Sequence, residues 1–266
     1  MKKLLTLLLI FFTLPAFTQV PEPSLLSLKG YGGNGVDQVH SHVTKTDDGG
    51  FIIAVSSNSD SNTGNIDSFC NIGGNRVIYL KYNSDASVLE WSKCLADGPY
   101  LFPQKDGSFI IGGITSAVPS GWAFKILKED ALGNILWRKT YGGQAASAIL
   151  SSMMEADDGG YIMAGGCNYT DTDFTIHYGS WMNADIAVVK VDSNGNKVWS
   201  KVIGGTGDES VASLIPASNG GCYIVGQTYS DDFDLTGNHG ANDAYSVRLD
   251  KNGNILWHQD LGGGRG

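Results

Sequence analysis

Carboxylate side chains gather in two polar stretches of this sequence, each of which lies between apolar segments. The candidate metal ligands are Asp171, Asp173 and Asp185 in the first stretch and Asp232, Asp234 and Asp243 in the second. Alternating carboxylate oxygens suit Ca²⁺, a hard cation that takes about 6–8 oxygen ligands in proteins. These aspartates therefore predict calcium binding.

The second stretch follows part of the spacing of an EF-hand calcium loop. Asp232, Asp234 and Thr236 occupy the first three ligand positions of that loop, and Gly237 stands where the loop turns sharply. Asp243 takes the last position, where an EF-hand has a bidentate glutamate. The alternative interpretation is a solvated acidic loop that binds no ion and keeps the neighbouring strands soluble.

No motif of a known catalytic type stands out. The sequence contains no G-x-S-x-G, no H-E-x-x-H and no phosphate-binding loop, and its histidines lack a metal-ligand spacing. Carboxylates are numerous, but nothing selects one pair as the acid and base of a glycosidase. We therefore expect no catalytic residues and no cofactor other than calcium, and a non-enzymatic role is favoured over catalysis.

Composition limits the classes of protein that these residues can belong to. The chain has 266 residues, a net charge of −9 and an isoelectric point of about 4.9, which argues against a nucleic-acid binder that tracks phosphates. Hydrophobic residues make up 42% and charged residues 17%, so a wholly disordered chain is excluded. Glycine, with 36 residues, is about twice as common as usual, which indicates many turns.

The N-terminus has the layout of a targeting segment. Lys2 and Lys3 precede an apolar run over residues 4–14, and a small-residue site follows Pro15. This pattern predicts a signal peptide over residues 1–18, export through the Sec pathway, and a secreted or cell-surface protein. A buried N-terminal helix is the alternative. The rest of the sequence has no apolar run of membrane-spanning length, so we expect no transmembrane segment after cleavage.

The four cysteines are Cys70, Cys94, Cys167 and Cys222. No C-x-x-C pair occurs, so a zinc site is not expected. In an oxidising compartment Cys70 and Cys94 are a possible disulfide, whereas Cys167 and Cys222 lie in apolar strand-like segments and are interpreted as buried thiols.

Two sequence units recur along the chain and must be the elements that position the acidic stretches. The first unit occurs at Asp130–Trp137, Asp192–Trp199 and Asp250–Trp257, with a degraded copy at Asn83–Trp91. The second occurs at Asp48–Ile53, Asp106–Ile111, Asp158–Met163 and Asn219–Ile224. Each repeat contains four short strand-like segments, and Asn194-Gly195 predicts a type I′ hairpin turn between the last two. Four-stranded units at this period predict a β-propeller.

The predicted all-β propeller covers residues 19–266, with repeats at about 27–95, 96–140, 141–202 and 203–261. Four visible repeats fit either a four-bladed ring or part of a larger propeller. We expect the repeated tryptophans to pack between blades, and the alternative is that they are stacking platforms for sugars. A basic residue stands two positions before each turn residue and is expected to pair with that residue or with the neighbouring blade; these residues are Lys81, Lys128, Lys190 and Arg248.

The order of Asp-Gly-Gly-Tyr-Ile, an acidic loop, Asp-x-x-Gly-Asn-x-x-Trp and then Gly-Gly resembles the repeats of secreted bacterial β-propeller proteins of the Bacteroidetes type. Such proteins often carry a C-terminal sorting domain for type IX secretion, which this sequence lacks. The Asp-x-x-Gly-x-x-x-Trp unit is also similar to the repeat of the quinoprotein (PQQ-like) propeller superfamily. The resemblance covers about residues 27–266, and its first segment, Ser27–Gly33, carries Ser27 at the tryptophan position.

The resemblance implies an exported, non-catalytic β-propeller that acts as a binding or adhesion module for a polysaccharide or a cell-surface protein. The alternative that it leaves open is a propeller enzyme, acting on glycans or as a degenerate quinoprotein-type oxidoreductase. The sequence alone names no ligand.

Overall fold

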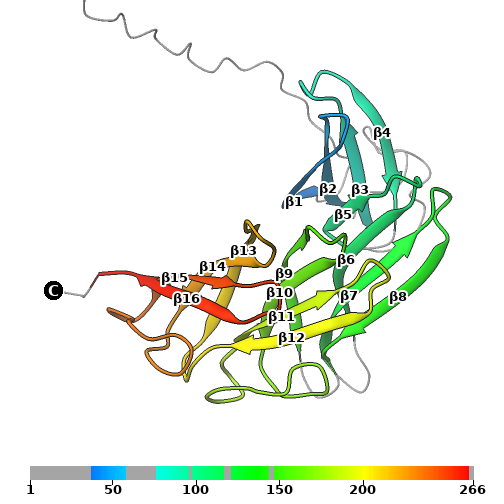
Figure 1. Ribbon diagram of the computed structural model, residues 1–266. Coiled ribbons are helices and arrows are strands. Elements are labelled where there is room, and N and C mark those ends of the chain that lie inside the picture. Colours follow the sequence, from blue (N-terminus) through cyan, green and yellow to red (C-terminus); the bar gives the residue numbers. More distant parts are fainter. Residues whose placement is uncertain (1–36, 58–75, 96–97, 117–120, 144–146, 264–266) are drawn as a thin grey trace, which may run out of the picture.

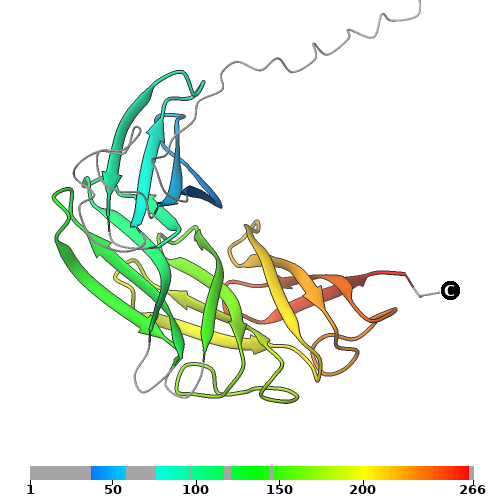
Figure 2. The ribbon, with the colours of Figure 1, turned by 180° about the vertical axis from the view of Figure 1, so that it is seen from behind.

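The computed structural model describes residues 37–57, 76–95, 98–116, 121–143 and 147–263. Within these ranges the regular structure consists of strands, with no helix, arranged as four separate sheets of four antiparallel strands. The chain therefore has a β-propeller-like repeat fold, as predicted, although the sheets do not close into a ring (Figures 1 and 2).

Each sheet is a meander in which neighbouring strands in sequence are neighbours in space. Sheet 1 contains β1 (Asp37–Lys45), β2 (Phe51–Ser57), β3 (Arg76–Tyr82) and β4 (Leu89–Cys94). Sheet 2 contains β5 (Tyr100–Pro103), β6 (Phe109–Ser116), β7 (Trp122–Glu129) and β8 (Ile135–Tyr141). Sheet 3 contains β9 (Ala148–Glu155), β10 (Tyr161–Cys167), β11 (Asp185–Val191) and β12 (Lys197–Ile203). Sheet 4 contains β13 (Glu209–Pro216), β14 (Cys222–Thr228), β15 (Asp243–Leu249) and β16 (Ile255–Leu261).

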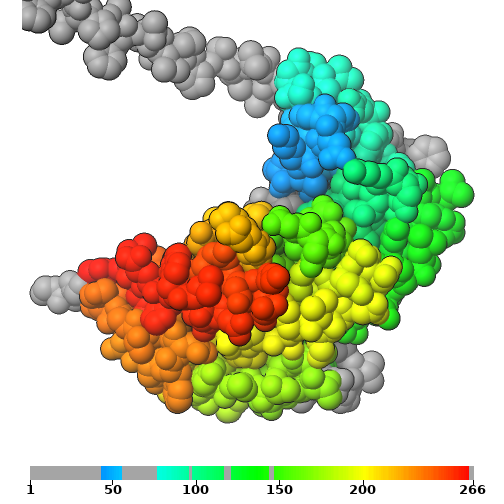
Figure 3. Space-filling model, in the orientation of Figure 1, coloured from blue at the N-terminus to red at the C-terminus, as the bar shows by residue number. Residues whose placement is uncertain are grey.

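The sheets follow one another along an open arc. The first strand of each sheet contacts the first strand of the next, from β1 to β5, β9 and β13. Sheets 1 and 4 stand at the two ends of the arc, and the space-filling view shows a hollow between them (Figure 3). Each internal sheet therefore has one face against the preceding sheet and one against the following sheet.

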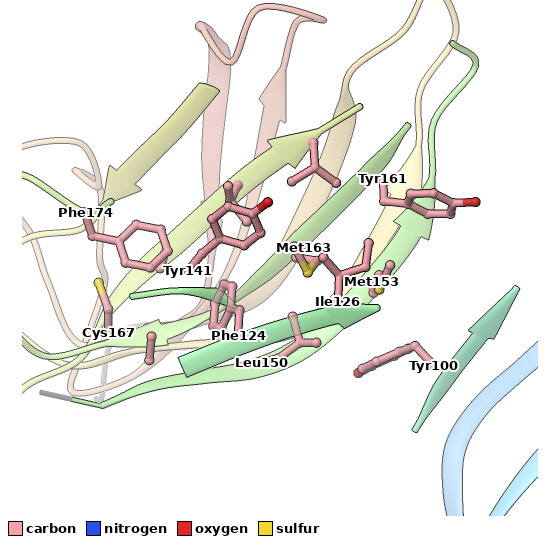
Figure 4. Packing of buried hydrophobic residues seen from close by; sticks show 14 of the residues in the cluster. Tyr100, Phe124, Ile126, Tyr141, Leu150, Met153, Tyr161, Met163, Cys167 and Phe174 are labelled. Carbon is pink, nitrogen blue, oxygen red and sulfur yellow. The ribbon is translucent and has the colours of Figure 1, made fainter. Parts of the chain in front are cut away.

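Apolar side chains fill the spaces between the sheets. The cluster between sheets 2 and 3 includes Phe124, Ile126, Met163 and Phe174, all buried, with the Phe124 and Phe174 rings 5.6 Å apart (Figure 4). Similar clusters join sheets 1 and 2 and sheets 3 and 4. Strands β10 and β11 are buried along almost their whole length because both of their faces are covered, which explains their continuous apolar sequence.

The last hairpin of sheet 3 differs from the predicted type I′ turn. Gly195 has a positive φ of 75°, but Asn194 does not, whereas a type I′ turn needs a positive φ at both central residues. Asp192 Oδ1 instead accepts hydrogen bonds from the backbone N–H groups of Asn194 and Asn196. The turn-type prediction is therefore wrong, because the aspartate side chain selects a longer loop with a bulge at the end of the strand.

The repeated tryptophans pack against the following sheet, as predicted, at three of the four positions. A Cβ added to Gly195 would lie 2.6 Å from the Trp137 ring, and one added to Gly253 would lie 2.9 Å from the Trp199 ring, so each indole covers a glycine of the following sheet. Trp91 packs edge-on against Phe109 of sheet 2 at a centroid distance of 6.0 Å. The packing prediction is wrong for the fourth tryptophan, Trp257 of β16. Its side chain lies on the face of sheet 4 that points away from sheet 3 and is partly exposed, because no described sheet covers that face.

The repeated basic residues pair with a different partner from the one expected. Lys81, Lys128 and Lys190 contact the aspartate of the first hairpin in their own sheet, at Nζ–O distances of 2.9, 2.9 and 2.5 Å. These aspartates belong to the second recurring sequence unit, at positions 48, 106 and 158. The recurring aspartate and the recurring cation therefore form one structural element that ties the first hairpin to the third strand.

Cys94 is disulfide-bonded, and its predicted partner Cys70 lies outside the described residues. Cys167 and Cys222 are free and buried, which confirms the interpretation of both as buried thiols. Burial raises the pKa of the Cys222 thiol to about 12. The predicted signal peptide at residues 1–18 and the segment Ser27–Gly33 also lie outside the described residues. Among the residues described there is no helix that is long and apolar enough to span a membrane.

Candidate functional site

The first acidic loop uses two of its predicted ligands for its own structure. Asp171 Oδ1 accepts hydrogen bonds from the backbone N–H groups of Asp173 and Phe174, at 2.7 and 2.8 Å. Asp173 accepts one from the Gly142 N–H at 3.0 Å and forms an ion pair with Lys197 at 2.6 Å. Both carboxylates therefore fix the loop against sheets 2 and 3.

The second acidic loop is held in a similar way. Asp232 accepts hydrogen bonds from the N–H and the hydroxyl of Thr206, both at 2.8 Å, and thereby joins the loop to the connection between sheets 3 and 4. Asp243 accepts from the backbone N–H of His239 at 2.7 Å and contacts His239 Nδ1 at 3.0 Å. These hydrogen bonds lower the pKa of Asp243. Gly237, expected at the sharp turn, has a positive φ of 104°.

The two remaining predicted ligands come together across the seam between sheets 3 and 4. Asp185 is fully buried at the start of β11, and its Oδ2 accepts a hydrogen bond from the Tyr178 N–H at 2.7 Å. Burial raises the pKa of Asp185 to about 7, and the nearby carboxylates of Glu209 and Asp234 raise it further against the effect of that hydrogen bond. Asp185 and Asp234 belong to different predicted loops, and no spacing along the chain indicates that they pair.

Glu209 is a residue of this seam that the sequence analysis missed. Its carboxylate accepts hydrogen bonds from the Gly205 N–H and from the hydroxyls of Thr228 and Ser230. Glu209 is itself buried at the first position of β13. The sequence does contain an indication of this role: Glu209 is the one charged residue of a strand that otherwise consists of apolar and small residues.

Within the described ranges, no group of three or more histidine, cysteine, aspartate or glutamate side chains is arranged to hold a metal ion. The six predicted calcium ligands therefore divide among three places: two cap and anchor the first loop, two anchor the second loop, and two lie at the sheet 3–4 seam. Calcium binding stays a prediction, and a rise in melting temperature in millimolar calcium over a chelator control is its test.

A groove lies at the opposite ends of the strands, where the first hairpins of sheets 1 and 2 meet. It has a volume of about 420 Å³. Its lining combines aromatic rings, amide and hydroxyl groups and charges of both signs, supplied by the turns of both sheets and by the end of β9. The lining includes Thr46, Asp48, Lys81, Trp91, Gln104, Lys105, Phe109 and Glu155.

The charges of the groove are balanced around a buried cation. Lys81 is almost fully buried and contacts Asp48 at 2.9 Å and Glu90 at 2.8 Å. Burial opposes the charged form of Lys81, but the hydrogen bonds to Glu90 and Asp48 outweigh it and raise the lysine pKa. A hydrogen bond from Thr46, together with that from Lys81, holds the pKa of Asp48 well below its usual range. The Asp48 carboxylate is therefore a fixed negative charge.

Aromatic rings and an amide group complete the lining of the groove. The Trp91 and Phe109 rings meet edge to face, and the Lys93 ammonium lies 4.9 Å from the Phe109 centroid. Gln104 Nε2 donates a 3.0 Å hydrogen bond to the Tyr161 hydroxyl, which ties the groove to sheet 3. Glu155, at the end of β9, has a pKa raised by burial and then by the nearby Asp47 carboxylate.

A smaller groove lies between sheets 3 and 4, where the first hairpins of these two sheets meet. It has a volume of about 270 Å³ and is lined by residues that include Asp158, Lys190, Gly221 and Lys251. Asp158 and Lys190 are equivalent to Asp48 and Lys81 of the first groove. The recurring aspartate and lysine can be read from the sequence, whereas the two grooves cannot, because a groove depends on how two sheets pack against each other.

No family model and no curated protein matches this chain. The solved structures that match include one described as "Crystal structure of the eukaryotic initiation factor", which is 8% identical, with a TM-score of 0.33. The match covers 84% of this chain and 55% of that one, so this chain spans about half the length of that structure. A similarity of this degree assigns neither a family nor a function.

Proposed function

We propose that this chain is an exported, non-catalytic module of the β-propeller type that binds a polysaccharide at or outside the cell surface. The groove between sheets 1 and 2 is the observation that carries the proposal. Ligand sites are commonly concave, with apolar and aromatic walls and a few well-placed polar groups, and this groove has that composition.

The chemistry of the groove suits a polyhydroxylated ligand in particular. The apolar face of a sugar ring packs on an aromatic side chain, and the partly exposed Trp91 ring, which the buried Phe109 ring supports edge-on, supplies one. Gln104 Nε2 and the Thr46 hydroxyl already donate to Tyr161 and Asp48, so Gln104 Oε1 and Thr46 Oγ1 would accept hydrogen bonds from sugar hydroxyls. The Lys81 charge is already neutralised by Asp48 and Glu90, so a strongly anionic ligand has little to gain there.

Binding to a panel of soluble polysaccharides, measured by isothermal titration calorimetry, tests this function. We expect Trp91→Ala and Gln104→Ala each to weaken binding by about tenfold or more, because a few central aromatic and polar groups usually carry most of the binding energy. Trp181→Ala removes an exposed indole outside the groove and is the matched control. Binding that both groove variants retain at full strength would contradict the assignment.

Export is tested separately. Expression of the full chain followed by N-terminal sequencing of the protein from the culture medium should show cleavage near residue 18. An intact N-terminus on cytoplasmic protein would contradict it. The binding measurement uses the mature protein and does not depend on this result.

Glycan cleavage is a second candidate, favoured by one observation. Glu155 has a raised pKa and lies in the groove near the Asp47 carboxylate, and a pair of carboxyl groups is the usual acid–base machinery of glycosidases. Release of reducing ends from the polysaccharide that binds, lost in Glu155→Gln, would support cleavage. Binding without turnover in the parent protein and in Glu155→Gln would leave the module non-catalytic.

A further inference from the structure

The sheet 3–sheet 4 contact shows how one repeat fastens onto the next at its outer edge. Trp199 of β12 lies over Gly253 in the last hairpin of sheet 4, and its Nε1–H donates a 2.9 Å hydrogen bond to the carbonyl of Lys251 in the same hairpin. Trp137 covers Gly195 in the same way between sheets 2 and 3. The outer attachment therefore needs an indole on one sheet and a glycine hairpin on the next.

A second attachment lies at the inner strands. The Ser152 hydroxyl of β9 accepts a 3.0 Å hydrogen bond from the Leu214 N–H of β13. Between sheets 1 and 2 the Thr44 hydroxyl donates a 2.7 Å hydrogen bond to the Leu101 carbonyl. Between sheets 2 and 3 the Tyr100 hydroxyl donates to the Ser151 carbonyl. At all three contacts a side chain of one inner strand bonds the backbone of the next.

Sheet 4 presents both attachment groups on the face that points away from sheet 3. Trp257 pairs with Arg248 in the same register as Trp199 with Lys190. Ser213 pairs with Val225 of β14 as Ser152 pairs with Ala164 of β10, so the two serines are equivalent. The Trp257 side chain is 43% exposed and makes a tilted ring contact with Tyr223 of its own sheet.

Apolar side chains surround these groups and are also exposed. Leu261 is 57% exposed, whereas Ile203, the equivalent residue of sheet 3, is fully buried. Ile215 is 47% exposed, whereas its equivalent Met154 is 6% exposed. This face repeats the pattern of the contact between sheets 3 and 4, and it lies at the end of the arc in both ribbon views (Figures 1 and 2).

We propose that the outward face of sheet 4 is a docking site for a further four-stranded sheet of the same repeat type. The partner must carry an Asp-x-Asn-Gly-Asn hairpin whose glycine receives the Trp257 ring and whose adjacent carbonyl accepts its Nε1–H. Its inner strand must supply a backbone N–H to the Ser213 hydroxyl.

The two attachment groups favour this occupant because each would bond the backbone of a strand or hairpin, as its equivalent does inside the arc. The face also sets a requirement on the partner. Ser246 occupies the place of Val188, which is fully buried between sheets 3 and 4. A docking sheet must therefore offer a hydrogen-bonding group opposite Ser246, since a buried hydroxyl without a partner is destabilising.

The test extends the full chain after Gly263 with a second copy of residues 206–263, which carries the required hairpin. The effect of Trp257→Ala on melting temperature is compared with and without this extension, with Trp122→Ala, an exposed indole at the start of β7, as the control. Without the extension we expect a shift of less than about 2 °C, as for a surface residue. With the extension we expect Trp257→Ala to lower the melting temperature by about 6 °C or more, as for a buried indole. The shift caused by Trp122→Ala should be the same with and without the extension.

Hydrogen exchange of the indole Nε1–H, followed by NMR, gives an independent measurement. In the extended protein the Trp257 signal should exchange as slowly as that of Trp199. A second extended protein carries a copy of residues 144–205 instead, so that the test does not depend on the folding of one particular copy. Equal Trp257→Ala shifts with and without either extension, or fast indole exchange in both, would overturn the proposal. Protection that rises with the concentration of the unextended protein would also overturn it and would assign the face to a second copy of the whole chain.

Discussion

Trp199 and Lys251 belong to different repeats, and the 2.9 Å hydrogen bond between the indole of the first and the backbone carbonyl of the second fastens sheet 3 to sheet 4. The indole lies over Gly253, where a side chain would collide with it. The repeated tryptophan and the repeated glycine of the sequence are thus two halves of one contact between successive repeats.

Gly253→Ala should destabilise the protein more than a glycine substitution without this contact. The variant meets two costs: a positive φ of 81°, which an L-residue adopts at about 1–2 kcal/mol, and a clash with the Trp199 ring. Gly159→Ala is the matched control, because Gly159 has a φ of 76° and nothing within 4 Å of the added Cβ. Denaturant unfolding should show an extra loss of about 1–3 kcal/mol for Gly253→Ala. Equal losses would contradict the contact between indole and glycine.

Stability should fall as pH rises because of Asp185. Its folded-state pKa is about 7, against 3.8 for an ordinary aspartate, so the stabilisation is complete below about pH 4 and is lost as pH rises through about 7. Asp185→Asn keeps the acceptor for the Tyr178 N–H and cannot ionise. We expect this variant to match the parent at pH 4 and to exceed it at pH 8 by up to about 4 kcal/mol.

Denaturant melts at a series of pH values check this prediction. Asp171→Asn is the control, because that carboxylate caps a loop and lies outside the Asp185–Glu209–Asp234 seam. A parent protein whose stability does not change between pH 5 and pH 8, or an Asp185→Asn variant that loses stability at pH 8, would show that the carboxylates do not interact as described.

Phe174 should contribute strongly to the contact between sheets 2 and 3. Its ring is fully buried against Phe124, so Phe174→Ala should cost about 3–5 kcal/mol in the free energy of unfolding. Phe233→Ala, in the corresponding loop of the next repeat, removes a ring that is 63% exposed and should cost less than about 1 kcal/mol. Similar losses for the two variants would contradict the difference in burial.

The sequence predicted the fold well, because the repeats carry local and periodic information. The recurring Asp-x-x-Gly-Asn unit located the last hairpins of sheets 2, 3 and 4, and the apolar runs located the buried strands. The turn type was predicted wrongly, because Asp192 Oδ1 bonds two backbone N–H groups and thereby selects a longer loop than Asn-Gly alone would.

The candidate site was predicted much less well. The six aspartates were assigned to loops by their spacing along the chain, whereas Asp185 and Asp234 meet only because sheets 3 and 4 pack together. The groove could not be found in the same way, because its walls come from Trp91 of sheet 1, Gln104 of sheet 2 and Glu155 of sheet 3. Contacts between repeats depend on the angle between sheets, which no local pattern encodes.

Amide hydrogen exchange of the protein, measured with and without the polysaccharide that binds most tightly, tests the central claim most directly. Binding in the groove predicts slower amide exchange in the first hairpins of sheets 1 and 2, at residues 44–51 and 102–109, and unchanged exchange in the acidic loops at residues 168–184 and 229–242. Slower exchange in the acidic loops with none in the two hairpins, or no change anywhere with any polysaccharide of the panel, would contradict it.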